Sequence, residues 1–322
     1  MSEFSRTIDL KIIEKLRDEE LFTKHLLPDI IDGKVFPAIR GGYVSFYYKG
    51  GSLFTYDGAF KTHIKYAFVP QGNENGYVGE NSLADMKQQV AFRAAYEQIK
   101  ARCAQYAGLE AAGVSELHKF SFAAYPAEWY YLLDTEIALD ASMRQDEAAD
   151  EALALSEEDK AQEIDTFSSP ELEEQPAPPT KKRATDRIDL LLMNAKTGRL
   201  LFCEAKLFSN KELTSTAKGK NVVDQLERYR GQIADKRDAI IAQYGAYARA
   251  MEALTGINID TSTGLCDGCG LLIFGFDQDQ KGGKKLETIK KWVTDKGFPV
   301  YAIGNIKGID PETLFTQLAK GV

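Results

Sequence analysis

The sequence runs Asp186-Arg187-Ile188-Asp189-Leu190-Leu191-Leu192-Met193 and then, after a short turn, Leu200-Leu201-Phe202-Cys203-Glu204-Ala205-Lys206. These two stretches decide the fold. Each has the length and the apolar composition of a buried β-strand. The segment between them, Asn194 to Gly198, ends in glycine, which favours a tight turn. We therefore predict a β-hairpin.

The second strand of this hairpin carries two charges inside an apolar run. Side chains alternate between the faces of a strand, so Glu204 and Lys206 share one face. The residues around them are apolar on both faces, as in a buried strand. Burying charges is costly unless they are paired or bound to a metal. The alternative is a surface hairpin with a solvated Glu–Lys pair.

The turn predicts which residue faces Glu204. A hairpin folded symmetrically about Lys196-Thr197 places Asp189 opposite Glu204, and a bulge at Gly198 would shift this by one residue. Opposed side chains have Cβ atoms about 5 Å apart. Two carboxylates that close repel each other unless one is protonated or a cation lies between them. Mg²⁺ is the expected cation, because it prefers oxygen ligands.

The charge of the chain is unevenly distributed. The 322 residues carry a net charge of −8. Residues 146–174 hold 12 acidic side chains and one basic side chain, so the rest of the chain has a net charge of +3. We expect 141–184 to be a disordered or loosely helical insertion. It is either a spacer or a regulatory segment that mimics nucleic acid, and the mildly basic body is compatible with binding phosphates.

Several classes of protein are not expected from the sequence. There is no apolar run long enough to span a membrane, and Met1 to Leu10 does not resemble a secretory signal. The four cysteines do not form a disulfide framework, which predicts a reducing, cytoplasmic setting. No phosphate-binding glycine loop of an ATPase is present.

The N-terminal region, residues 1–78, is expected to form a unit of its own. Its first thirty residues have helical periodicity. Val35 to Phe68 is rich in aromatic and β-branched residues and is interrupted by glycine-containing turns, which predicts an antiparallel sheet of about four strands. The unit would serve docking, dimerisation or nucleic-acid contact, since its aromatic and basic side chains either clamp nucleic acid or simply pack.

The remaining chain, residues 79–322, is predicted to alternate helices and strands in an α/β fold. Ser82 to Tyr106 is expected to be a helix covered on two sides. The further elements are a strand at Trp129–Leu139, the hairpin, a long helix at Asn221–Leu254, a strand at Gly270–Phe276, a helix at Lys285–Thr294 and a strand at Phe298–Ile303.

The helix after the hairpin supplies Gln225 and Tyr229, one turn apart on one face. Together with Ile188-Asp189 and Glu204-Ala205-Lys206, they resemble the PD-(D/E)XK nuclease superfamily, specifically RecB-like branches with a QxxxY helix. The resemblance covers roughly residues 82–303. Ile188 stands where the motif has Pro, and no motif identifies the acidic residue of the first helix.

The resemblance implies a restriction-endonuclease-like α-β-β-β-α-β core with a mixed sheet. It also implies that Asp189, Glu204 and the carbonyl group of Ala205 hold one or two Mg²⁺ or Mn²⁺ ions. Lys206 would position the attacking water or stabilise charge, and Gln225 would orient the metal shell or contact a phosphate. Tyr229 would act similarly or belong to the core.

For the missing acid of the first helix we nominate Glu97, with Glu136 on the following strand as its rival. Glu97 lies on the same helix face as Met86, Val90 and Ala94, an unusual place for a carboxylate without a function. The alternative is a partly exposed glutamate beside Lys100 or Arg93. Further contacts to phosphates are expected from four residues: Gln232, Lys236, Lys284 and Lys285.

Cys266-Asp267-Gly268-Cys269 is a single CxxC, and only Cys103 lies upstream of the hairpin as a partner for it. An iron–sulfur cluster or zinc is therefore not expected, and the CxxC is read as a turn before the strand at Gly270.

The sequence thus predicts a metal-dependent nuclease that cuts DNA, in defence or repair. The alternatives are a non-catalytic binding module on the same fold and a ribonuclease.

Overall fold

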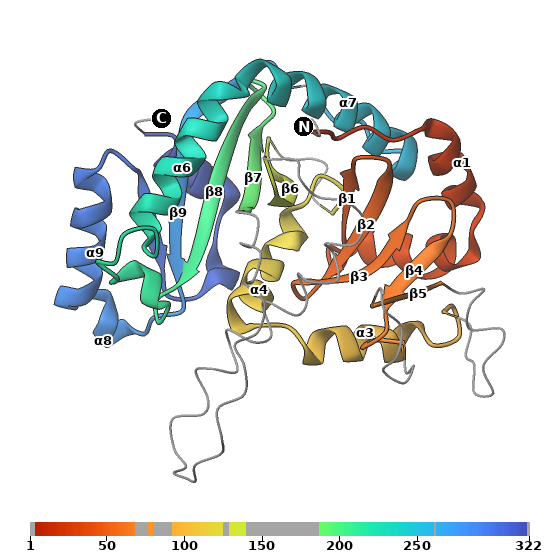
Figure 1. Ribbon diagram of the computed structural model, residues 1–322, viewed down its shortest axis with the longest axis horizontal. Helices are drawn as coiled ribbons and strands as arrows, with labels where there is room; N and C mark the ends of the chain where they lie inside the picture. The colour runs from red at the N-terminus through yellow and green to blue at the C-terminus, as the bar shows by residue number, and fades with distance from the viewer. Residues whose placement is uncertain are drawn as a thin grey trace, which may run out of the picture.

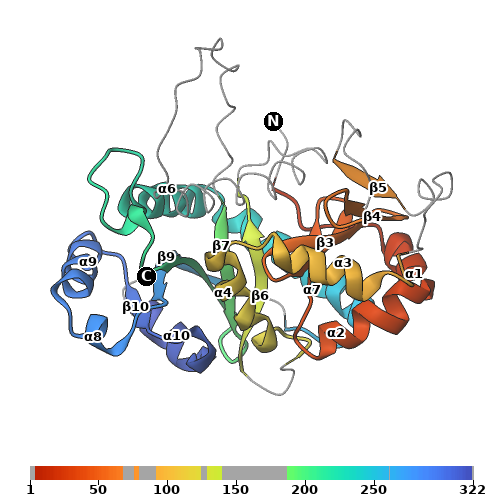
Figure 2. The same ribbon diagram turned by 90° about the horizontal axis from the view of Figure 1, so that it is seen from below.

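The computed structural model describes residues 4–67, 76–79, 92–124, 129–139, 187–260 and 262–320. Within them the chain forms a mixed α/β structure with two five-stranded sheets, which lie side by side in Figures 1 and 2. The predicted insertion at 141–184 lies outside the described residues, as do residues 80–91, where the helix expected from Ser82 would begin. None of the described helices is long and apolar enough to cross a membrane.

The first sheet is antiparallel, as predicted, with its strands in sequence order. Its strands are β1 (Phe36–Arg40), β2 (Tyr43–Tyr48), β3 (Gly51–Tyr56), β4 (Phe60–His63) and the additional β5 (Tyr77–Gly79). The predicted interruptions at Gly41-Gly42, Gly50 and Asp57-Gly58 lie between consecutive strands, whereas Gly51 is already the first residue of β3. The expected N-terminal helix consists of α1 (Leu10–Asp18), a π-helical turn (Phe22–Leu26) and α2 (Leu27–Ile31).

The second sheet is mixed and has the order β10-β9-β8-β7-β6. Its strands are β6 (Tyr130–Ile137), β7 (Ile188–Asn194), β8 (Arg199–Leu207), β9 (Gly264–Phe274) and β10 (Val300–Ile303). The first three pair antiparallel, and β9 and β10 continue the sheet in parallel. Besides the helix that follows the hairpin, the helices that contact it are α4 (Leu109–Val114), α9 (Lys284–Asp295) and α10 (Pro311–Leu318), and the short α8 (Gln278–Lys281) contacts α9.

The long helix predicted over 221–254 is in fact two helices, α6 (Val222–Asp235) and α7 (Arg237–Thr255). Lys236 separates them with a backbone conformation, φ −113 and ψ 14, that is not helical. The break is needed because α6 packs against β9, whereas α7 continues across to α1 and β1 (Figure 1). A single straight helix would not cover both sheets.

The strand predicted to begin at Gly270 begins at Gly264, so Cys266 and Cys269 lie within β9 and the prediction of a turn there is wrong. The reason is the length of β8, which pairs with β9 from Arg199 onward. An irregularity in the pairing, between Leu200 and Phe202 of β8, absorbs the extra residues of the CxxC.

The helix expected to be covered on two sides is covered on one side within its described part, α3 (Tyr96–Gln105). Tyr96, Ile99 and Cys103 are buried against the first sheet, where α3 packs on β2 and β3. Ala94 and Ala101, on the other face, are exposed. The stripe that predicts this second face also contains Leu83, Met86 and Val90, which lie outside the described residues, and no described element covers its two alanines.

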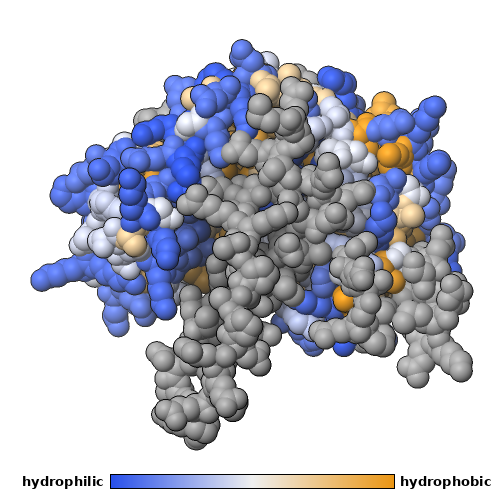
Figure 3. All heavy atoms as spheres, in the orientation of Figure 1, coloured by the Kyte–Doolittle hydropathy of each residue, from blue (hydrophilic) through white to orange (hydrophobic). Residues whose placement is uncertain are grey.

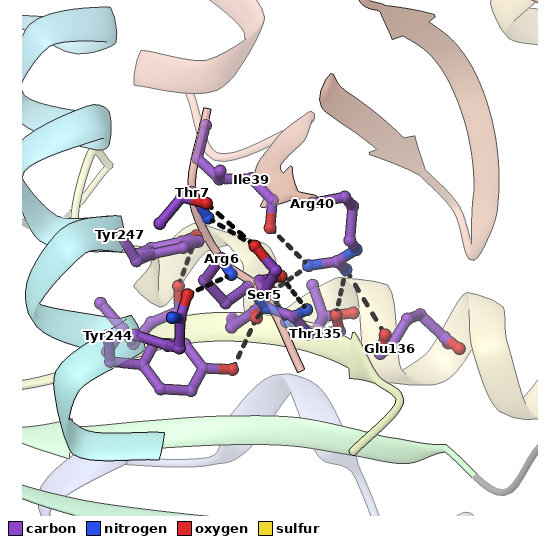
Figure 4. Close-up of polar contacts among 12 residues, drawn as sticks. Ser5, Arg6, Thr7, Ile39, Arg40, Thr135, Glu136, Tyr244 and Tyr247 are labelled. Carbon is purple, nitrogen blue, oxygen red and sulfur yellow. Dashed lines mark hydrogen bonds and ion pairs between the residues drawn. The ribbon is translucent and has the colours of Figure 1, made fainter. Parts of the chain in front are cut away.

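A buried ion-pair network joins the two sheets around Asp134 of β6 (Figure 4). Arg40 of β1 donates from Nη1 to Oδ1 of Asp134 at 2.9 Å, and Arg6 donates from Nε to Oδ2 at 2.8 Å. Burial alone would raise the pKa of the Asp134 carboxyl, but the two guanidinium groups outweigh it and hold the pKa below its usual range.

Two tyrosines of α7 complete the network. Tyr244 donates its hydroxyl to Oδ2 of Asp134 at 2.7 Å, and Tyr247 donates to the carbonyl of Leu133 at 2.8 Å. Arg40 also donates from Nη2 to the carbonyl of Thr135 at 2.6 Å. The segment that precedes α1, the first sheet and α7 therefore all converge on one short stretch of β6.

Replacing Asp134 by Asn should strongly destabilise the protein. The variant leaves two buried guanidinium groups without a counter-charge, and removing one partner of a buried ion pair typically costs about 3–5 kcal/mol. Urea unfolding followed by circular dichroism measures this loss.

The matched control is Asp295→Asn, which breaks the exposed pair with Lys291. It should cost less than about 1 kcal/mol. Equal losses in the two variants would show that the network around Asp134 does not hold the sheets together.

Candidate active site

The β7–β8 hairpin has the register predicted from its turn. The pairs run from Asn194 opposite Arg199 to Leu190 opposite Cys203, and one further step brings Asp189 opposite Glu204. Gly198 takes a left-handed φ of 64° in the turn without shifting the register. The hairpin prediction is therefore confirmed, and the bulge that would have moved Asp189 does not occur.

Asp189 is held by the backbone of the neighbouring strand. Its Oδ2 accepts a hydrogen bond from the backbone N–H of Ala205 at 2.7 Å. The side chain is thereby directed across β8, and the residue is only partly buried. Asp189 thus lies beside the Glu204-Ala205-Lys206 segment, as the hairpin geometry requires.

Glu204 and Lys206 form a buried ion pair. The Nζ of Lys206 lies 2.9 Å from Oε1 of Glu204, and the residues are 7% and 1% exposed. The alternative of a solvated surface pair is therefore wrong. Oε2 of Glu204 is buried and has no hydrogen-bond partner among the described residues. A buried carboxylate oxygen without a donor is costly and indicates a place for a ligand.

Two further carboxylates surround Lys206. Glu110 of α4 places Oε1 3.7 Å from Nζ of Lys206, and its Oε2 accepts from the backbone N–H of Leu207 at 2.8 Å. Glu212, in the short 3₁₀ turn Lys211–Leu213, places Oε2 2.9 Å from the same ammonium. One lysine therefore faces three carboxylates.

Glu136 of β6 adds a carboxylate on the far side of Asp189. The pairs Thr135–Leu190 and Ile137–Ile188 place Glu136 opposite Asp189. Facing positions on three adjacent strands thus carry Glu136, Asp189 and Glu204. Glu136 has a left-handed φ of 53°, which is strained for a residue other than glycine, and such strain often occurs at functional sites.

The pKa values of the cluster reflect its excess of negative charge. Burial raises the pKa of Glu204 to about 7, and burial together with Glu204 raises the pKa of Asp189 well above its ordinary value. Burial also raises the pKa of Glu136. Burial would lower the pKa of Lys206, but the surrounding carboxylates outweigh it and raise that pKa. Such shifts cluster at functional sites.

Gln225 and Tyr229 of α6 face this cluster. Gln225 donates from Nε2 to the Tyr229 hydroxyl at 2.8 Å, and Tyr229 in turn donates to the backbone carbonyl of Arg187. Tyr229 is fully buried, and burial followed by the charges of Glu204 and Asp189 raises its pKa. Oε1 of Gln225 is buried and has no partner in the described chain. Tyr229 therefore fixes the orientation of the Gln225 amide.

The structure does not bring Glu97 to the cluster. Its side chain is 75% exposed and lies 3.3 Å from Lys100, on the face of α3 that no element covers in the described chain. Glu136, its rival in the sequence analysis, does lie beside Asp189, and Glu110 of α4 also reaches the cluster. Reasoning from the sequence missed Glu110, because six-residue α4 is too short to show periodicity. Glu212 was missed because it lies in no motif.

The residues predicted to contact phosphates are spread over two elements. Lys236, at the end of α6, donates from Nζ to the carbonyl of Leu139 at 2.6 Å, and half-buried Gln232 lies one turn earlier. Lys284 and Lys285 are exposed in the first turn of α9. Lys285 donates to the carbonyl of Phe208 at 3.3 Å.

The four cysteines are buried free thiols. Cys103 lies on α3 and donates to the carbonyl of Tyr48, whereas Cys203, Cys266 and Cys269 lie on β8 and β9. Among the described residues, no group of three or more histidine, cysteine or acidic side chains is already arranged around a metal position.

Comparisons with models of protein families, with curated proteins and with solved structures found no match to this chain.

Replacing Glu204 by Gln should change how stability depends on pH. The raised pKa means that the folded wild type gains stability when Glu204 is protonated. That contribution is complete below about pH 4.5 and is lost as the pH rises to about 7. Gln is always neutral. Between pH 5 and pH 8 the free energy of unfolding of the variant should therefore rise relative to that of the wild type, by up to about 3 kcal/mol.

Urea unfolding of both proteins in EDTA across this pH range is the measurement. A difference in stability that stays constant with pH would contradict a raised pKa at Glu204.

Proposed function

We propose that this protein is a metal-dependent nuclease of the PD-(D/E)XK type that hydrolyses phosphodiester bonds in DNA. The observation that carries the proposal is the grouping of partly buried Asp189 with buried Glu204 and Lys206 on adjoining strands, next to Gln225 and Tyr229 of α6. Buried charges of both signs are costly. A catalytic role would explain why the fold keeps these charges together and leaves one carboxylate oxygen of Glu204 without a hydrogen-bond donor.

The order of elements around the site supports the proposal. The chain passes through α4, β6, β7, β8, α6 and β9, and the first three of these strands are antiparallel while β9 joins in parallel. This order resembles the α-β-β-β-α-β core of the superfamily. In that comparison α4, which carries Glu110, corresponds to the first helix.

The donor set suits a hard divalent cation. Asp189 and Glu204 offer carboxylate oxygens, and Glu110 and Glu136 add negative charge nearby. We propose that Asp189, Glu204 and the Ala205 carbonyl hold Mg²⁺ or Mn²⁺, with water and substrate phosphate as the other ligands, because Mg²⁺ usually keeps such ligands. A cation there would also relieve the repulsion that raises the carboxyl pKa values.

When bound, the cation supplies a water of lowered pKa as the nucleophile. Lys206, held by carboxylates and charged at neutral pH, stabilises the negative charge that develops on the phosphate. Gln225 presents its amide oxygen to the site while Tyr229 holds the amide in place. Each residue thus has a separate task, and the strands hold them in fixed positions.

The biological setting that we propose is a reducing, cytoplasmic one, in defence against foreign DNA or in repair. The four free cysteines support the reducing setting. A non-catalytic binding module has no comparable need for buried Glu204 and Lys206, so it is treated as an outcome of the test below, as is cleavage of RNA.

Incubation with linear, circular and single-stranded DNA and with RNA, in Mg²⁺ or Mn²⁺, tests the proposal. The wild type should cut DNA, and EDTA should abolish cleavage. The variants Asp189→Asn, Glu204→Gln and Lys206→Met should each lower the rate by at least about a hundredfold, since each removes a group that acts on the reacting atoms. Calorimetric titration with Mn²⁺ should show weaker binding in the first two variants.

Glu287→Gln and Lys291→Ala on the surface of α9 are the matched controls, and both should cut at the wild-type rate. Both residues make only exposed ion pairs, with Lys290 and Asp295. If the wild type cuts nothing, or if all variants cut equally, the protein is a binding module or acts elsewhere. Cleavage of RNA alone would assign a ribonuclease.

Replacing Tyr229 by Phe should lower the rate of cleavage about tenfold or more, because the Gln225 amide loses the group that orients it. It should also cost about 1–3 kcal/mol of stability, since the Arg187 carbonyl loses its donor. Single-turnover rates and urea unfolding give the two quantities.

Tyr247→Phe is the control for stability alone. It removes a similar buried hydroxyl, bound to the Leu133 carbonyl at 2.8 Å. It should be destabilised to a similar degree yet cut normally. If both variants lose the same activity, Tyr229 acts only through stability.

A further inference from the structure

One surface of this acidic protein is rich in lysine. Residues 208–221 hold three lysines and one acidic residue, and residues 276–296 hold six lysines and four acidic residues. Their combined net charge is +4, although the chain as a whole carries −8. We use the name lysine ridge for five of these side chains: Lys211, Lys218, Lys220, Lys281 and Lys284.

The ammonium groups of the lysine ridge are available for a ligand. All five residues are exposed, and their side chains make no hydrogen bond or ion pair within the part of the chain that the structure describes. Nearby Lys290 and Lys291 differ, because each is paired with a glutamate or aspartate of its own helix.

The lysine ridge begins at the candidate active site. Lys211 precedes Glu212, whose carboxylate lies 2.9 Å from Lys206. Lys285 joins the two parts of the ridge, because it donates to the Phe208 carbonyl and lies 4.5 Å above the Phe208 ring. Figures 1 and 2 show segment 208–221 between α6 and α9, and Figure 3 shows mostly hydrophilic side chains over these elements.

The side chains of the lysine ridge are suited to binding phosphate groups and not to stacking on bases. Proteins that bind single strands use exposed aromatic side chains on which bases stack. The large apolar side chains that are exposed in the described chain are Leu10, Ile31, Tyr106, Leu109 and Trp129, and none lies on the ridge. Lysine alone contacts the backbone without reading sequence. A duplex offers the densest line of phosphates.

We infer that the lysine ridge is where the protein binds the backbone of double-stranded DNA, independently of sequence, and leads it to the site at Glu204 and Lys206. The inference deepens the proposed nuclease function and rests on it. It assigns duplex DNA as the substrate. It also assigns binding of the DNA backbone to Lys211, Lys218 and Lys220, which belong to no sequence motif.

Fluorescence anisotropy of a short labelled duplex with the full-length Glu204→Gln protein tests the inference. Measured between about 50 and 200 mM KCl, the logarithm of the binding constant falls linearly with the logarithm of the salt concentration. The slope should shrink by about 0.9 for each contacting lysine that is removed. Lys211→Gln, Lys218→Gln and Lys220→Gln combined should therefore reduce the slope by about 2 to 3 and weaken binding at least about tenfold.

The control carries the same change of charge on the opposite half of the molecule: Lys11→Gln, Lys15→Gln and Lys24→Gln, all exposed. Its slope should stay near that of the parent. Equal effects of the two triple variants, no binding of duplex, or tighter binding of single-stranded DNA or RNA would each overturn the inference. DNA binding through the ridge without cleavage by the wild type would instead contradict the nuclease function, whereas cleavage with an unchanged slope would contradict the ridge alone.

Discussion

The buried carboxylate of Asp134 is the interaction on which the arrangement of the two sheets depends. It accepts from Arg6, Arg40 and Tyr244, which come from the segment before α1, from the first sheet and from α7. An unpaired charge at this depth would be very costly, so the three elements are held to β6 together. Glu136 lies two residues further along the same strand, and Arg40 donates to the intervening carbonyl of Thr135. The network therefore also sets the backbone that borders the candidate active site.

The site itself is organised by an excess of negative charge around one ammonium group. Lys206 faces Glu110, Glu204 and Glu212, and Asp189 lies beside them on β7. In a buried setting such an excess raises carboxyl pKa values and favours a bound cation. The sign of the excess charge differs between the site and the surface beside it. Carboxylates outnumber the ammonium group inside the site, whereas the lysines of the lysine ridge outside it are exposed and make no ion pair among the described residues.

Local patterns allowed the hairpin to be predicted, and with it the core of the site. The side-chain alternation of a strand and the length of one turn were enough to place Asp189 opposite Glu204. The helical spacing of Gln225 and Tyr229 placed both on one face of α6. The same rules failed where distance in sequence was large. Glu97 was chosen for its helix face, but α3 packs on the first sheet, and Glu110 reaches Lys206 from a helix without a pattern.

The sequence alone was therefore sufficient for the two hairpin strands, their register and the grouping of Asp189, Glu204 and Lys206, because these depend on contacts between residues close along the chain. Only the tertiary structure shows that the helix after the hairpin breaks at Lys236, that Asp134 joins the sheets, and that Glu110 and Glu212 lie around Lys206. Those features come from packing between distant segments. The free energy of burying a charge depends on what surrounds it, and no local pattern records that.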